Sequence, residues 1–85
     1  MKIFEYTITD PLGIHARPAG AIAAKAKEFA SQITVAKGDK TADGRRLFAL
    51  MGLSAKAGDT LIVTCIGEDE DAAAAALRAL LEANL

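Results

Sequence analysis

His15 is the only histidine of the chain, and Arg17 follows it two residues later. Imidazole is a nucleophile near neutral pH when one ring nitrogen is unprotonated. A guanidinium offers a planar set of donors that suits phosphate oxygens. Pro18 rigidifies the next turn and leaves the amides of Ala16 and Arg17 as the nearest backbone donors. Together these groups could accept, hold and release a phosphoryl group.

The elements around the histidine place it at the start of a helix. Residues 2–9 alternate apolar and polar side chains, which predicts a half-buried strand. The run from Asp10 to Gly13 breaks that strand, and apolar residues recur at helical spacing from about 16 to 30. His15 is therefore predicted to be the N-cap. The first amides of a helix lack internal partners, and such a helix start binds anions.

The rest of the chain continues the alternation of strands and helices. We expect strands at 32–37, 40–43 and 60–66, a short helix at 47–53, and a final helix that starts in the acidic run 68–71 and is completed by 72–83. The order is β-α-β-β-α-β-α. This order predicts an α+β fold in which helices pack on one face of an antiparallel sheet.

Size and composition restrict the functions that can be considered. With 85 residues we expect one domain over residues 1–85 with a modest core. Ten basic and eleven acidic residues argue against nucleic acid as a partner. No signal peptide and no membrane-spanning run of about 20 apolar residues are visible, so a cytoplasmic protein without membrane insertion is expected. The lone Cys65 reads as a packed thiol in a strand.

No cofactor or metal is expected. The acidic run 68–71 favours a solvated helix start over a metal site, because no histidine or cysteine accompanies it. No acidic residue adjoins His15, and the chain has no Gly-rich phosphate-binding loop. The site could hold a phosphoryl group but could not take one from a nucleotide unaided. That combination favours a carrier that depends on partner enzymes over an enzyme with its own turnover.

The heptapeptide Gly13-Ile14-His15-Ala16-Arg17-Pro18-Ala19 resembles the phosphorylation signature of the HPr family, the histidine-containing phosphocarriers of the bacterial phosphoenolpyruvate:sugar phosphotransferase system. The likeness extends over the whole chain in length and element order. It includes the Met51-Gly52-Leu53 segment and the Ala57-Gly58-Asp59 turn. The resemblance implies an open-faced β-sandwich, in which a four-stranded antiparallel sheet is covered on one face by three helices.

The resemblance also implies the reaction and the partners. His15 would be phosphorylated on Nδ1, as a pros-phosphohistidine, by Enzyme I, and would pass the phosphate to IIA units of sugar permeases. Arg17 would stabilise the phosphate beside Ala16 and Pro18. Transcriptional or metabolic regulators are further candidate partners. A shuttle between large partners is expected to be a monomer.

A surface for partner docking is implied as well. Its residues are Ala16, Gly20, Arg46, Leu47, Phe48 and Met51. The family usually has a small side chain at the position of Gly20, where this chain has bare backbone. Core packing is the other interpretation of the apolar residues at 47–51, and in so short a helix some of them must be buried.

One position bears on regulation. Many HPr proteins of Gram-positive bacteria have a regulatory serine before the second helix, and the matching residue here is Arg46, preceded by Arg45. Without a hydroxyl, serine-based regulation is not expected there. Three alternatives remain open: a paralogue in a regulatory or nitrogen-related phosphotransfer branch, a non-catalytic interaction module, and a small acylphosphatase-like phosphatase. The phosphatase would need an amide side chain to orient water, and the only asparagine is Asn84.

Overall fold

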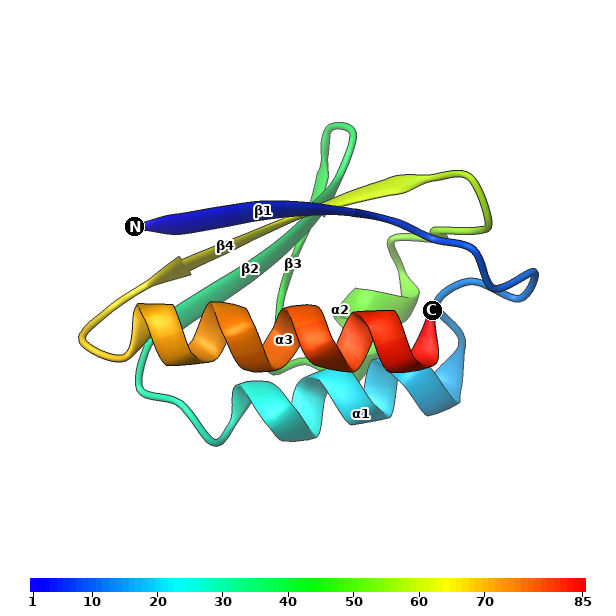
Figure 1. Ribbon diagram of the computed structural model, residues 1–85. Coiled ribbons are helices and arrows are strands. Elements are labelled where there is room, and N and C mark those ends of the chain that lie inside the picture. The colour runs from blue at the N-terminus through cyan, green and yellow to red at the C-terminus, as the bar shows by residue number, and fades with distance from the viewer.

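The computed structural model describes residues 1–85 and contains four strands and three helices (Figure 1). The elements are β1 (Lys2–Thr7), α1 (Ala16–Ala26), β2 (Gln32–Lys37), β3 (Lys40–Asp43), α2 (Leu47–Met51), β4 (Thr60–Ile66) and α3 (Glu70–Asn84). The strands form one antiparallel sheet in the order β1-β4-β2-β3. The predicted element order and the predicted antiparallel sheet are therefore confirmed.

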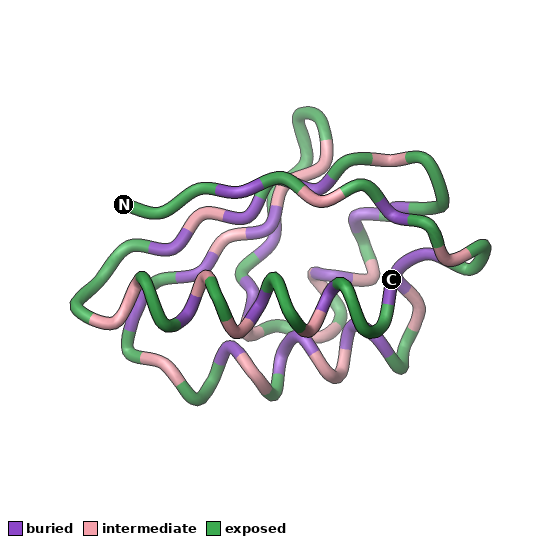
Figure 2. The backbone as a smooth tube through the Cα atoms, in the orientation of Figure 1, coloured by how far each residue is buried: buried purple, intermediate pink, exposed green.

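The three helices cover one face of this sheet. Helices α1 and α3 lie side by side and run in opposite directions, and the short α2 packs beside α1 and β3 (Figure 1). Buried side chains alternate along the strands, as period-two geometry requires (Figure 2). The core is formed mainly by Phe4, Ile8, Ile22, Ile33, Val35, Leu50, Leu53, Leu61, Val63, Leu77 and Leu81. The other face of the sheet carries no helix, and Ile3, Ile62 and Ile66 are exposed.

The first strand and the first helix are shorter than predicted. β1 ends at Thr7, because the amide of Ile8 turns to the Asp59 carbonyl and that of Thr9 to the Leu85 main-chain oxygen. α1 ends at Ala26, whereas helical spacing predicted it to continue to about residue 30.

Contacts from distant residues explain the early end of α1. The Asp69 carboxylate accepts hydrogen bonds from the amides of Ala30, at 2.8 Å, and Ser31, at 2.9 Å, and from the Ser31 hydroxyl. The Arg45 guanidinium donates to the carbonyls of Phe29, at 2.6 Å, and Ser31, at 3.1 Å. The Phe29 and Ser31 carbonyls and the Ala30 and Ser31 amides are thus satisfied by tertiary partners, and helical continuation would remove those partners.

The two later helices also differ from their predicted bounds. α2 ends at Met51, two residues early, because Gly52 closes it and Ser54 then takes a left-handed backbone conformation with φ of 53°. α3 begins at Glu70, inside the acidic run as predicted, and ends at Asn84, one residue later than predicted. Glu70 and Asp71 lie in its first turn. Carboxylates near the positive end of a helix are stabilising, so the acidic run does start the helix.

Cys65 is fully buried in β4, as predicted, and burial raises the pKa of its thiol. No helix is long and apolar enough to cross a bilayer. No three histidine, cysteine, aspartate or glutamate side chains gather into a group that could bind a metal ion.

Candidate functional site

His15 occupies the N-cap of α1, as the sequence predicted. Its backbone is extended, with φ of −108° and ψ of −171°, and its carbonyl accepts the first helical hydrogen bond, from the amide of Ala19 at 3.0 Å. The side chain is partly exposed and makes no hydrogen bond that would tie it down. The imidazole is therefore available to an incoming group.

Two backbone donors beside the imidazole are free. The amides of Ala16 and Arg17 donate to no group of the protein, and no side chain caps the helix. Pro18, the third helical residue, has no N–H and is buried. Its ring leaves these two amides as the only unpaired donors of the first turn. Free amides and the helix dipole together favour an anion at this end of α1.

Arg17 is exposed and has no partner in the protein. Its guanidinium takes part in none of the ion pairs or side-chain hydrogen bonds. A free guanidinium two residues from a nucleophilic ring can form charge-assisted hydrogen bonds to a phosphoryl group. His15, Arg17 and the two amides thus lie together at the start of α1, and none of the three residues lines a pocket.

The backbone just before His15 is held by contacts with Ala55 and Lys56, in the loop after α2. The amide of Ile14 donates to the Ala55 carbonyl at 2.9 Å, and Ile14 is buried. Gly13 has a φ of 63°, and a Cβ there would lie 2.1 Å from the Ala55 oxygen and 2.6 Å from the Lys56 Cα. Only glycine fits this contact, so Gly13 is more than a turn residue.

The apolar residues at 47–51 divide between core and surface. Leu50 is fully buried, Leu47 and Met51 are half-buried, and Phe48 has 81% of its surface exposed. Ala16, on α1, is exposed, and Gly20 is half-buried with no atom within 4 Å of where a Cβ would lie. Leu47 and Met51 therefore pack partly against the core, and the Phe48 ring is the largest apolar group that the core leaves uncovered.

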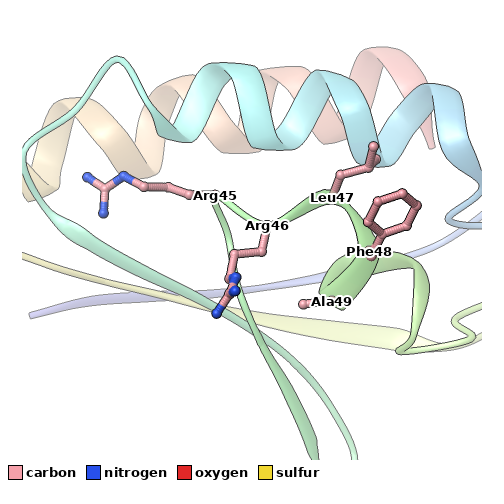
Figure 3. A pocket seen from close by; sticks show the side chains of 5 residues that line it. All are labelled: Arg45, Arg46, Leu47, Phe48 and Ala49. Carbon is pink, nitrogen blue, oxygen red and sulfur yellow. The ribbon is translucent and has the colours of Figure 1, made fainter.

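The two arginines before α2 have different surroundings. Together with Leu47, Phe48 and Ala49 they line a surface pocket of about 410 Å³. Their side chains diverge, and Leu47 points toward α1 (Figure 3). Arg45 is held by the Phe29 and Ser31 carbonyls, while Arg46 is exposed and unpaired. Both arginines keep their charge, but only the Arg46 guanidinium is free of protein hydrogen bonds.

Sequence reasoning missed the side-chain contacts of the loop after α2, which lies against the backbone before His15. Lys37 donates to the Ser54 carbonyl at 3.1 Å and pairs with the Asp59 carboxylate at 3.2 Å. Hydrogen bonding from the Lys56 amide, and then from Lys37, lowers the pKa of Asp59. The only local signal was the Ala57-Gly58-Asp59 turn, which indicates a reversal of the chain and nothing about its contacts.

An open-faced sandwich that presents a free imidazole at a helix start on its surface fits one class of protein, the small phosphoryl carriers. The comparisons agree with this class. The family model described as the PTS HPr component phosphorylation site matches residues 3–83. The chain therefore belongs to the HPr family of phosphocarrier proteins.

Individual relatives cover nearly the whole chain. The phosphocarrier protein HPr of Lysinibacillus sphaericus is 47% identical over 95% of this chain and 92% of its own length. The phosphocarrier protein NPr of Shewanella violacea is 38% identical over 94% and 88%. The solved structure of a mycoplasma histidine-containing phosphocarrier protein superimposes with a TM-score of 0.91 at 32% identity, covering 93% of this chain and 90% of that one.

Proposed function

We propose that this protein accepts a phosphoryl group on Nδ1 of His15 from phosphorylated Enzyme I and passes it to IIA units of sugar permeases. The observation that carries the proposal is the partly exposed imidazole at the N-cap of α1, beside two unpaired amides and a free guanidinium. Family membership supports a general role as a phosphocarrier of the phosphotransferase system.

The transfer conserves the phosphoryl group. The lone pair of Nδ1 attacks phosphorus, the N–P bond forms, and the bond from phosphorus to the donor breaks with its electron pair returning to the donor. The amides of Ala16 and Arg17 and the Arg17 guanidinium donate to the phosphoryl oxygens. The second transfer reverses these steps with an acceptor in place of the donor.

The same site favours a carrier over a phosphatase. No pocket encloses the phosphoryl group, and the partners that would hold it are exposed. Asn84, the only asparagine, donates its side-chain amide to the Leu80 carbonyl at 2.8 Å and so serves α3. A carrier must release its phosphate readily, and a few solvent-exposed donors meet that requirement.

The partner surface is proposed to be Ala16, Gly20, Arg46, Leu47, Phe48 and Met51. Phe48 supplies an exposed ring, and Arg46 adjoins it with a charge that no acidic side chain neutralises. A partner of opposite charge with an apolar patch would cover both groups.

The decisive experiment is incubation with Enzyme I and phosphoenolpyruvate. The wild type should gain one phosphate, measured by intact mass, and acid treatment should remove it. His15→Ala should gain none while keeping its circular dichroism spectrum. An acid-stable phosphate, or full phosphorylation of His15→Ala, would move the modification to a hydroxyl and end the proposal.

The relative named NPr favours one alternative, a role in a nitrogen-related phosphotransfer branch. The same assay separates the two branches when it is run with Enzyme I of the sugar system and, in parallel, with its nitrogen-branch counterpart. Faster loading by the first supports the sugar branch, and faster loading by the second supports the alternative.

A further inference from the structure

We infer that Lys37 is a positioning residue for His15, acting through the loop from Ser54 to Asp59. The inference rests on the proposed function, because the position of the imidazole matters only if the ring takes up a phosphoryl group. It is built on a continuous series of contacts between the end of β2 and the start of α1.

The contact nearest to His15 joins the two loops. Ile14 directly precedes His15, and its amide donates to the Ala55 carbonyl at 2.9 Å. Gly13 lies against the same peptide unit, with no room even for a methyl group. A shift of the Ala55 carbonyl must therefore move the backbone that carries the imidazole.

The peptide next to that contact is the one that Lys37 holds. The Lys37 ammonium donates to the Ser54 carbonyl at 3.1 Å, one residue before Ala55. Ser54 is the only non-glycine residue with a positive φ, a conformation that is sterically unfavourable for an L-residue. A backbone in this conformation relaxes unless its neighbours hold it.

Lys37 also reaches the far end of the loop. Its ammonium lies 3.2 Å from the Asp59 carboxylate, which in turn accepts the Lys56 amide at 2.9 Å. No other side chain from outside the loop hydrogen-bonds to residues 54–59. Buried Leu53 and Ala55 anchor one half of the loop by packing. Backbone hydrogen bonds tie Gly58 and Asp59 to Ile8 and close the turn from Lys56 to Asp59. The Lys37 ammonium adds the only side-chain contact that joins the Ser54 carbonyl to this turn.

The test compares Lys37→Met with Lys37→Arg and Lys2→Met. Methionine keeps the apolar stem and removes the ammonium, while arginine keeps donors for both oxygens. Lys2→Met is the matched control. Lys2, on β1, makes an exposed ion pair with Asp71, on α3, at 3.5 Å. For each variant, the rate of phosphorylation by Enzyme I and the ring proton chemical shifts of His15 are measured.

We expect Lys37→Met to slow phosphorylation about fivefold, well below the ~100-fold that a misplacement of about 1 Å can cost. The His15 ring resonances should shift in the same variant. Lys37→Arg should restore both readouts, and Lys2→Met should leave both unchanged. Circular dichroism of each variant checks that the fold is retained.

Two failures are distinguishable. If Lys37→Met leaves the ring resonances and the rate as they are in the wild type, or if Lys2→Met produces the same changes, the inference is overturned. If the wild type takes up no phosphate, the proposed function fails, and shifted ring resonances in Lys37→Met would still support the positioning role.

Discussion

At the scale of single residues, the site depends on groups that the fold leaves without partners. The His15 imidazole, the Arg17 guanidinium and the amides of Ala16 and Arg17 all lack protein partners, in a structure where no buried side-chain polar atom is unsatisfied. Unpaired groups on a surface cost little because water solvates them. They are then free to exchange water for a phosphoryl group.

Arg17 should matter for transfer and not for folding. We expect Arg17→Ala to slow phosphorylation of His15 about tenfold, since charge-assisted hydrogen bonds contribute about 1.5–3 kcal/mol and exposure to water reduces that value. The urea midpoint of unfolding should stay unchanged, because the side chain touches no partner. Lys27→Ala removes an exposed cation at the other end of α1 and is the control. It should change neither the phosphorylation rate nor the urea midpoint.

At the scale of elements, helix α1 contains a glycine, Gly20, that lowers its stability although the packing around it does not require a glycine. Gly20 lies in the middle of the helix with ordinary helical backbone, and a Cβ there would meet no atom within 4 Å. Gly13 and Gly44, in contrast, face atoms closer than 3 Å. Steric need therefore explains those two glycines and leaves Gly20 without a structural reason.

Replacing this residue should strengthen the helix. We expect Gly20→Ala to raise the free energy of unfolding by about 0.5–1 kcal/mol, because alanine loses less backbone entropy in a helix. Urea denaturation measures the change. Ala24→Gly, at an exposed position of the same helix, should lower stability by a similar amount. A destabilised Gly20→Ala would mean that the space beside the helix is smaller than described.

The sequence predictions succeeded where local interactions set the structure, and they failed where contacts between residues distant in the sequence set it. The strands at 32–37, 40–43 and 60–66 have the predicted bounds, since alternation and the adjoining turns are local signals. The N-cap at His15 was likewise predictable from its neighbours. The end of α1 was not, because Asp69 lies 38 residues from Ser31 in the chain. The contact of Lys37 with Ser54 was hidden for the same reason.

At the scale of the whole molecule, a few polar side chains join the three helices at the turn between α1 and β2. Asp69 is the N-cap of α3, yet its carboxylate binds the turn between α1 and β2 and caps no amide of its own helix. Arg45 reaches the same turn from the segment before α2. Ser31, between them, is fully buried. Three helices are thus joined at one turn.

This junction should be sensitive to acid. The hydrogen bond from the Ser31 hydroxyl, and then that from the Ala30 amide, lowers the pKa of Asp69 below its ordinary value of 3.8. A lowered folded pKa adds stability that is present above the ordinary value and is lost as the pH falls through the folded one. Asp69→Asn should therefore be less stable than wild type at pH 7.

The pH profile separates this effect from a general loss of charge. Because asparagine does not titrate, the difference in melting temperature between Asp69→Asn and the wild type should narrow from about pH 5 to about pH 2. Asp71→Asn is the control, since it removes another carboxylate from the same helix start. The only partner of the Asp71 carboxylate is the exposed Lys2. A gap that stays constant with pH would contradict this assignment.

The two chain ends leave the molecule at opposite poles, and this matters to anyone who attaches a tag or a second domain. Met1 lies beside the start of α3, whereas Leu85 lies at the end where α1 begins, with its main-chain oxygen bound by Thr9 and Asp10 (Figure 1). A fusion joined through Met1 would leave the histidine end clear. One joined through Leu85 would emerge next to it and compete with any visiting protein for space.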